Sequence, residues 1–221
     1  MEPEKQPVSD EELACEAQAG SLFDFEELVH RYEGRIFRFV ANSIHNQADA
    51  QEVTQETFVT AYLKLRQFDA KRSFATWLFT IARRKCIDRH RATRLAFEER
   101  MAEPADAKDP SVLLIQREAE DELWQLARRT LPELQCQALW LKYAEEMSVE
   151  QIARVLRRTQ VHVKVLLFRA RTRLARELET QAARETPGGR SYTNSQFPRT
   201  LEKPGIRVTR PSKLDEVCKG C

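Results

Sequence analysis

Glycine is almost absent from the first 186 residues of this chain, and its scarcity limits what the chain can fold into. The sequence has six glycines, of which only Gly20 and Gly34 precede Thr186. An all-β protein needs tight turns at short intervals, and many of those turns require glycine. Over most of this length apolar residues instead recur at steps of three and four, which is the pattern of amphipathic helices. The sequence therefore predicts an all-α protein.

Short polar side chains mark where the helices of the first half are expected to begin. Such side chains accept hydrogen bonds from the free N–H groups of a first helical turn. The predicted N-caps are Ser9, Ser21, Asp49 and Ser73. The first helix is expected to stop near Gly20, and the third to break at residues 67–72.

The helical pattern lapses in the middle of the chain and then resumes. Residues 103–110 are polar and contain two prolines, which indicates a linker. Further helices are then expected over residues 112–130, from Pro132 in a first turn to about 143, from the capping box 148–151, and from Thr159 to about 178. We therefore predict two small helical domains, 1–95 and 112–180, joined by a flexible linker, 96–111, and followed by a flexible C-terminal tail, 181–221.

Charge is unevenly distributed along the chain, although the net charge is only +2. Residues 81–95 hold six basic side chains against Asp88, and residues 151–178 hold eight against Glu177. Residues 1–33 hold two basic side chains against ten acidic ones. Two separate basic segments suit a two-point contact with a polyanion such as DNA. Two solvated helix faces would give the same pattern.

Several classes of protein are disfavoured by what the chain lacks. No stretch approaches the ~20 apolar residues of a membrane span, and the N-terminus is acidic, unlike a signal peptide, so we expect a cytoplasmic protein without membrane insertion. No glycine-rich phosphate loop, clustered metal ligands or nucleophile elbow is present. These features predict a protein that is not an enzyme and needs no cofactor.

The five cysteines are an odd number with scattered spacing, which indicates reduced thiols. Cys15, Cys86 and Cys136 are expected to be small buried hydrophobic residues. Cys218 and Cys221 have the spacing of metal ligands, but zinc prefers four ligands and no histidine lies nearby. They are weak candidates for a metal or redox site, and no metal is expected.

The second basic segment has the pattern of a helix-turn-helix motif. A short helix with Ile152 and Ala153 is followed by a tight turn near Arg157 and a longer helix. In this motif the second helix enters the major groove of DNA. The apolar positions of the longer helix are Val163, Leu167, Ala170 and Leu174. An ordinary helical hairpin is the alternative.

Residues 49–58 read DAQEVTQETF, residues 73–83 read SFATWLFTIAR, and residues 131–173 contain the helix-turn-helix pattern. These three segments resemble sigma factors of the extracytoplasmic-function (ECF) group within the sigma-70 family. Residues 49–58 resemble the DAEDLVQEvF segment that grips the β′ clamp helices of core RNA polymerase. Residues 73–83, SFATWLFTIAR, with Ile87 and Asp88, are similar to the sFrtWLyrIArNlaiD stretch of region two. Residues 131–173 resemble region four, which binds the −35 promoter element and the β flap. The likeness covers about residues 20–178 in the family's order.

The resemblance implies a sigma factor that binds core polymerase and directs promoter recognition and DNA melting. Its implied partners are core RNA polymerase, promoter DNA and an anti-sigma factor. The implied polymerase-binding residues are Asp49, Glu52, Gln55 and Glu56, on a helix expected to bury Val53, Phe58 and Tyr62. The implied −10 residues are Phe68, Asp69, Lys71, Arg72, Arg83, Arg84, Lys85 and Arg89. The implied −35 residues are Arg158, Thr159, Gln160, His162, Lys164, Val165, Phe168, Arg169 and Arg171.

The chain departs from the family pattern at three places. Arg84 stands where asparagine is usual, and Arg157 stands at a turn position where glycine is usual, so a left-handed backbone there would cost energy. Val165 and Leu166 replace a serine and an arginine expected to face DNA. Val161, Val165 and Phe168 are therefore expected to touch either thymine methyl groups or a protein partner. A helix-turn-helix regulator and a sigma mimic acting as a protein-interaction module remain alternatives.

Overall fold

The computed structural model describes residues 8–44, 46–100 and 120–185. Within those residues it has eight α-helices, one 3-10 helix and no strand, so the prediction of an all-α protein is confirmed. The first half contains α1 (Asp10–Gln18), α2 (Leu22–Ala41), α3 (Gln47–Lys64), η1 (Leu65–Gln67) and α4 (Phe74–Arg100). The second half contains α5 (Glu120–Thr130), α6 (Glu133–Tyr143), α7 (Val149–Leu156) and α8 (Gln160–Glu185).

Side-chain caps begin the helices of the first half, and all but one were predicted correctly. Ser9 and Glu12 form the expected capping box, and Ser21 accepts a hydrogen bond from the N–H of Asp24. The prediction of Asp49 as a cap was wrong. Asn46 caps α3 instead, because its side chain accepts from the N–H of Asp49 at 3.1 Å.

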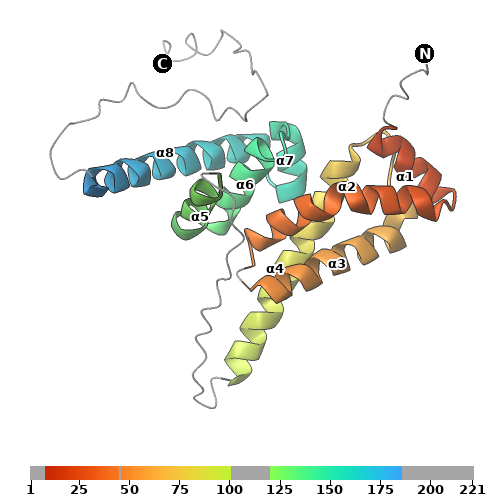
Figure 1. Cartoon of the computed structure of the whole chain (residues 1–221), viewed down its shortest axis with the longest axis horizontal. Coiled ribbons are helices and arrows are strands. Elements are labelled where there is room, and N and C mark those ends of the chain that lie inside the picture. Colours follow the sequence, from red (N-terminus) through yellow and green to blue (C-terminus); the bar gives the residue numbers. More distant parts are fainter. Residues whose placement is uncertain (1–7, 45, 101–119, 186–221) are drawn as a thin grey trace, which may run out of the picture. The chain divides into compact units, whose positions relative to one another are not determined.

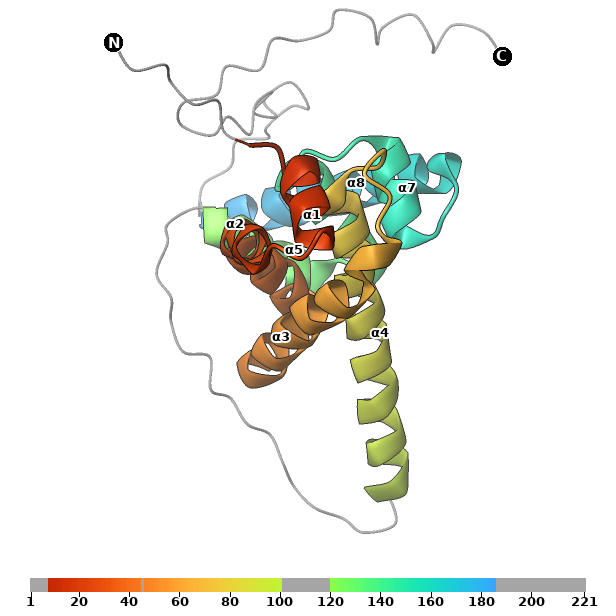
Figure 2. The ribbon, with the colours of Figure 1, turned by 90° about the vertical axis from the view of Figure 1, so that its right-hand side faces the viewer.

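The first half is held together by an aromatic core between α2 and α4. The rings of Tyr32 and Phe74 meet edge to face with centroids 5.5 Å apart, and those of Phe39 and Phe79 do so at 5.2 Å. Edge-to-face pairs of this kind stabilise a core beyond their buried area. Helix α3 lies alongside α4, and the C-terminal part of α4 extends away from α2 and α3 (Figures 1 and 2).

Two helices are longer than the sequence pattern predicted. Helix α4 continues to Arg100, five residues into the segment predicted as linker. Helix α8 continues to Glu185 rather than ending near residue 178. Residues 96–100 and 181–185 lack a strong apolar stripe, but both segments are rich in good helix formers, which extend an existing helix at little cost. The rest of the predicted linker and tail lies outside the described residues.

The second half has its own ring contact and its own capping box. Trp124 of α5 and Trp140 of α6 have ring centroids 4.6 Å apart. Pro132 is the N-cap of α6 rather than a residue of its first turn, and its fixed φ suits that place. Ser148 and Gln151 form the predicted capping box at the start of α7.

Candidate nucleic-acid interface

Helices α7 and α8 form the helix-turn-helix that the sequence predicted. Arg157 ends α7 in the left-handed conformation, with φ 49° and ψ 51°. The N–H of Arg158 donates to the carbonyl of Ala153 at 3.0 Å, which closes the turn over the end of α7. Thr159 then caps α8 by accepting from the N–H of His162 at 3.2 Å. The turn therefore has a left-handed residue at the position where the family usually has glycine, and in this chain that residue is Arg157.

All nine residues predicted to contact the −35 element are exposed on this turn and on α8. Within the described part of the chain, no carboxylate lies within ion-pair distance of Lys164, Arg169 or Arg171. The Arg171 side chain instead donates to the carbonyl of Leu167 one turn earlier. These cations are accordingly placed to meet an external anion.

One position on α8 does not face outward as expected. Leu166 is only 6% exposed and belongs to the core with Val163 and Leu167. The prediction that this position faces DNA was wrong, because it lies on the inward side of the helix. Val161 and Phe168, by contrast, are 71% and 62% exposed. The family's arginine is thus replaced by a core leucine, while the apolar residues that remain outward form a surface.

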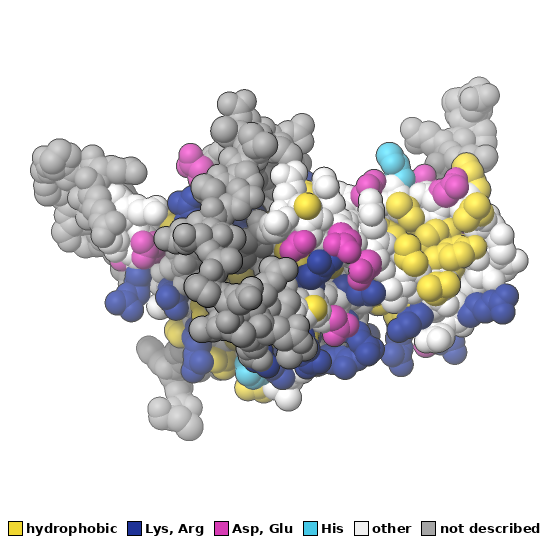
Figure 3. Space-filling view, turned by 90° about the horizontal axis from the view of Figure 1, so that it is seen from below, with side chains coloured by type: hydrophobic (Ala, Val, Ile, Leu, Met, Phe, Trp, Pro, Cys, Tyr) yellow, Lys and Arg dark blue, Asp and Glu magenta, His cyan; other side chains and the backbone are white. Residues whose placement is uncertain are grey.

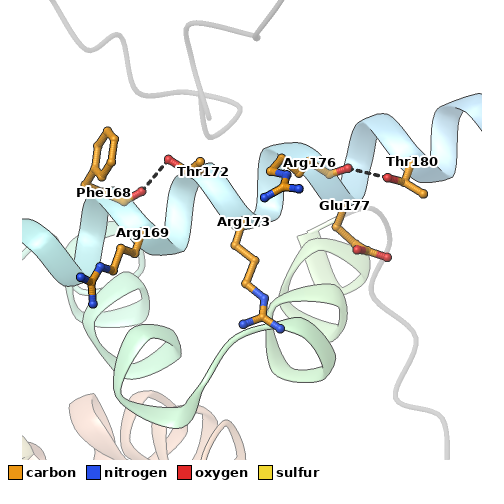
Figure 4. A pocket seen from close by; sticks show the side chains of 7 residues that line it. All are labelled: Phe168, Arg169, Thr172, Arg173, Arg176, Glu177 and Thr180. Carbon is orange, nitrogen blue, oxygen red and sulfur yellow. Dashed lines mark hydrogen bonds between the residues drawn. The ribbon is translucent and has the colours of Figure 1, made fainter.

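Figure 4 shows the hollow that runs along the exposed side of α8. Phe168 and Thr172 project from one edge of the helix, and Arg169 and Arg173 project from the other. The hydroxyl of Thr172 donates to the carbonyl of Phe168 at 3.0 Å, so this threonine is satisfied within the helix. The N-terminal part of the hollow therefore has Phe168 and Thr172 along one edge and two arginines along the other, and Arg176, Glu177 and Thr180 line its C-terminal part.

Phe68, predicted to contact the −10 element, is a core residue. It is 5% exposed, and its ring lies 5.5 Å from Phe74 and 5.3 Å from Trp77. The prediction that Phe68 contacts DNA was wrong, because its ring packs against Phe74 and Trp77 inside the fold. Phe74 is also buried and Trp77 partly so, as expected of core residues.

The loop after Phe68 is anchored by α1. The side chain of Gln18 donates to the carbonyls of Leu65 and Phe68 at 2.7 and 2.8 Å, and the carboxylate of Glu11 accepts from the N–H of Phe74 at 2.9 Å. These three hydrogen bonds join residues 47 to 63 positions apart, so no local sequence signal marks them. Anchoring at both ends fixes where the loop presents its side chains.

The side chains in that loop are exposed and form a local charge cluster. The carboxylate of Asp69 accepts from the backbone N–H of Lys71 at 3.1 Å and pairs with Arg72 at 3.5 Å. The side chains of Lys71 and Arg72 are both exposed on this anchored loop. Exposed cations held in a fixed position can meet the phosphates of single-stranded DNA.

The basic face of α4 is not uniformly available to DNA. Arg84 is exposed, whereas Arg83 is partly buried and burial lowers the pKa of its guanidinium. Lys85 pairs with Glu56 at 3.1 Å, and Arg89 pairs with Asp49 at 3.5 Å and with Glu52. The pairing with Glu52 raises the pKa of Arg89. The structure therefore brings two predicted −10 residues onto the predicted polymerase-binding helix.

The outward face of α3 is acidic and polar. Gln51, Glu52, Gln55 and Glu56 are exposed, and Val53 is buried. Lys85 and Arg89 limit the freedom of three carboxylates on this face: Asp49, Glu52 and Glu56. A shallow hollow follows the same face as far as Val59 and Thr60. The face is thus a set of carboxylates held in place rather than a loose solvated stripe.

The acidic face continues into an apolar surface that the sequence reasoning missed. Tyr62 was expected to be buried, but it is 52% exposed and meets the ring of Phe25 at 5.0 Å. The neighbouring exposed apolar residues are Leu22, Phe23, Val59 and Leu63. Figure 3 shows hydrophobic side chains gathered in one patch with Lys and Arg side chains beside it. The consecutive pairs Leu22–Phe23 and Tyr62–Leu63 were the available signal, because neighbouring residues point about 100° apart and such pairs widen the apolar surface of a helix.

The cysteines fall into two groups. Cys86 and Cys136 are buried as predicted, and desolvation raises the pKa of their thiols to about 12 and about 11. Cys15 is exposed, so its prediction as a buried residue was wrong. Cys218 and Cys221 lie outside the described residues, as does any site they form. Residues 8–44, 46–100 and 120–185 contain no cluster of metal ligands and no helix apolar enough to cross a bilayer.

Comparison with protein families places both halves in one class. Residues 28–95 match the model of sigma-70 region 2, and residues 122–174 match that of sigma-70 region 4. The first match includes α3 and most of α2 and α4, and the second includes α6, α7 and parts of α5 and α8, which are the elements that carry the surfaces described above. The class is that of RNA polymerase sigma factors.

Individual relatives narrow the class. The chain is 30% identical to the RNA polymerase sigma-H factor of Pseudomonas aeruginosa, over 77% of this chain and 94% of that protein. It is 30% identical to the ECF RNA polymerase sigma factor BldN of Streptomyces coelicolor, over 77% of this chain and 66% of that protein. The identity with ECF sigma factor SigW of Bacillus subtilis is 27%, over 74% and 93%. The chain belongs to the ECF subfamily of the sigma-70 family, whose members act in transcription initiation.

Two solved structures share the fold. CnrH in complex with the cytosolic domain of CnrY matches with a TM-score of 0.57 and 27% identity, over 77% of this chain and 97% of that one. The sigma factor RpoE of Bartonella quintana, in complex with the anti-sigma factor NepR, matches with a TM-score of 0.61 and 20% identity, over 71% and 97%. Because its sequence identity is only 20%, the second match supports the fold alone.

Proposed function

We propose that this chain binds core RNA polymerase through α3 and reads the −35 element through α8. It contacts the −10 element through the loop after Phe68 and through Arg83 and Arg84 of α4. Residues 1–95 then act as region 2 and residues 112–180 as region 4, with 96–111 between them and 181–221 as a tail. The polymerase supplies the chemistry, and the chain acts in the cytoplasm, where the chromosome is.

The observation that carries the proposal is the ordered acidic face of α3. A face that binds a basic partner helix gains from carboxylates whose positions are fixed before contact. Asp49, Glu52 and Glu56 are held by Lys85 and Arg89, and Gln55 lies exposed among them. The family match covers this helix in full. We assign these four residues to the β′ clamp helices of core polymerase.

The predicted −10 residues divide into two roles under this proposal. Asp69, Lys71, Arg72 and Arg84 are exposed and contact DNA, with Arg83 beside them. Lys85 and Arg89 act instead as positioning residues, because each forms ion pairs with carboxylates of α3. Phe68 supports the loop from the core.

We assign the −35 element to the turn between α7 and α8 and to α8 itself. Arg158, Thr159 and Gln160 lie where a recognition helix begins, and the first residues of such a helix meet base edges. His162, Lys164, Arg169 and Arg171 lie along it within reach of phosphates. Val165 and Phe168 lie on the outward side of α8, between these basic residues. Region 4 also offers a surface for the β flap.

An anti-sigma protein is the expected regulatory partner. CnrH was solved with the cytosolic domain of CnrY, and that match has 27% identity. The apolar patch around Tyr62 and Leu63 joins the acidic face of α3, so a protein bound there would compete with core polymerase.

A pull-down of core polymerase with the double variant Glu52→Lys/Glu56→Lys tests the proposal. We expect loss of core binding, since the variant presents cations to a basic partner. The matched control is Glu16→Lys/Glu33→Lys, which makes the same charge change at exposed positions of α1 and α2. Binding equal to that of the wild type in the first variant, with an unchanged helical circular dichroism spectrum, would place the polymerase on another surface.

A further inference from the structure

The outward centre of α8 is an apolar stripe one residue wide. Its exposed members, Val161, Val165, Phe168 and Thr172, recur at steps of four, three and four. At 3.6 residues per turn these steps keep all four on one line along the helix. The inward side is made of Val163, Leu166, Leu167, Ala170 and Leu174, all buried. The stripe therefore faces directly away from the core.

Basic side chains flank this stripe on both sides. The helical steps place Lys164 and Arg171 along one side of it, and His162, Arg169 and Arg173 along the other. Figure 4 shows part of this order, with Phe168 and Thr172 on one edge of α8 and Arg169 and Arg173 on the other. All these flanking side chains are exposed. Across the exposed side of α8, the apolar stripe thus lies between two rows of basic side chains.

The major groove of DNA has the complementary cross-section. Its two walls are phosphates, and its floor carries the 5-methyl groups of thymine, which are apolar. From Val161 to Phe168 the stripe is about 10 Å long at 1.5 Å per residue, which matches about three base-pair steps of 3.4 Å. A partner helix from a protein would need acidic residues along both sides of one narrow apolar seam.

We propose that Val161, Val165 and Phe168 determine which −35 sequence is read, by packing against thymine methyl groups on the groove floor. This inference rests on the proposed function of α8. The cations on both sides hold the helix in the groove and carry no sequence information. The apolar stripe supplies the preference for thymine that the flanking cations do not.

The test begins by assembling the full chain with core polymerase and selecting bound sequences from duplexes randomised over the −35 region. Enrichment of a sequence with thymine is expected. Each enriched thymine is then replaced by deoxyuridine, which removes the methyl group and leaves base pairing intact. We expect about a fourfold loss of affinity for each methyl group in contact with the stripe, the value of one buried methyl-sized group.

Variants connect that loss to named residues. Phe168→Ala and Val165→Ala should bind the thymine and deoxyuridine duplexes with more nearly equal affinity. Lys164→Ala should bind both more weakly, keep their ratio, and lower the slope of log affinity against log salt by about one. Val165→Thr keeps one methyl group and should retain part of the discrimination.

The outcomes separate this inference from the function on which it rests. An enriched sequence whose affinity does not change with deoxyuridine overturns the inference and leaves promoter recognition standing. Full retention of the thymine preference by Phe168→Ala also overturns the inference, and the stripe then belongs to a protein partner. A holoenzyme that enriches no sequence overturns the proposed function and this inference together.

Discussion

The basic faces of α4 and α8 both carry an excess of positive charge but use their cations differently. On α4, Lys85 and Arg89 turn toward α3 and pair with its carboxylates. On α8, Lys164 and Arg169 have no carboxylate within ion-pair distance among the described residues. Part of one basic segment is therefore paired with an acidic helix of the same chain, whereas these two cations of the other segment remain available to an external anion.

The difference follows from what lies next to each helix. Helix α4 runs alongside α3, whose outward face is acidic, so the nearest anion to its cations is intramolecular. Helix α8 packs its inward side on aliphatic residues and exposes the rest. The role of an arginine is thus set by its neighbours across the fold, which a count of charges along the chain does not contain.

The largest expected effect tests α8. The triple variant Lys164→Ala/Arg169→Ala/Arg171→Ala removes three candidate phosphate contacts, so the slope of log affinity against log salt for DNA should fall by about three. The measurement is a salt titration of promoter binding by the chain loaded on core polymerase. A slope that equals that of the wild type would mean that these cations do not face phosphates, and the contrast with α4 would disappear.

The second prediction sharpens the contrast at Cys86, on the buried side of α4. Burial raises the pKa of this thiol from an ordinary value of 9.0 to about 12. The folded state therefore keeps the proton where the unfolded chain loses it, so the stability is fully present below pH 9 and is lost as the pH rises toward 12. The free energy of unfolding should fall by about 1.4 kcal/mol per pH unit in that window.

The matched variant for that measurement is Cys86→Ala. Its urea unfolding between about pH 8 and about pH 10.5 should show a shallower alkaline decline than the wild type, because the thiol no longer contributes. The inward side of α8 has no titratable residue among its buried positions between Val163 and Leu174. Equal declines in the two proteins would contradict the assigned burial of Cys86.

The third prediction concerns the turn that aims α8. Arg157 holds a left-handed backbone at φ 49°, which costs a non-glycine residue ~1–2 kcal/mol. Arg157→Gly should raise the free energy of unfolding by about 0.5–1 kcal/mol, since glycine's greater freedom in the unfolded chain offsets part of the gain. Arg154→Gly, inside α7, should lower it by about 1 kcal/mol. A loss of stability in Arg157→Gly would mean that the arginine side chain stabilises the turn.

The smallest expected effect tests the ion pairs on α4. Arg89→Ala and Lys85→Ala remove surface pairs, so each should lower the free energy of unfolding by less than about 1 kcal/mol. Both should weaken core binding while leaving the salt slope for DNA unchanged, because they position α3. A reduced salt slope in either variant would restore that residue to the DNA-contacting set.

Local patterns in the sequence predicted the helices well and their ends less well. Ser9, Ser148 and Thr159 cap as expected, because capping depends on residues three positions apart. The start of α3 was missed because Asp49 and Glu52 resemble a capping box, whereas Asn46 lies one turn earlier. The ends of α4 and α8 were missed because a helix continues through good helix formers without an apolar stripe.

The candidate site was predictable where family motifs covered it and less so where contacts are distant. The exposure of Glu52, Lys164 and Phe168 followed from helical spacing. The burial of Phe68 depends on rings from α4, and the pairing of Arg89 depends on a helix 37 to 40 residues earlier. Such contacts are made by the tertiary fold, and no window of the sequence contains them.

Run-off transcription tests the central claim most directly. The full chain and core RNA polymerase are incubated with a DNA template that carries a promoter selected by the holoenzyme. We expect a specific transcript that requires the chain, is lost with Glu52→Lys/Glu56→Lys, and is weakened with the α8 triple variant. If core polymerase with the chain gives no transcript beyond that of core alone, while the chain still binds DNA by itself, the protein is not acting as a sigma factor.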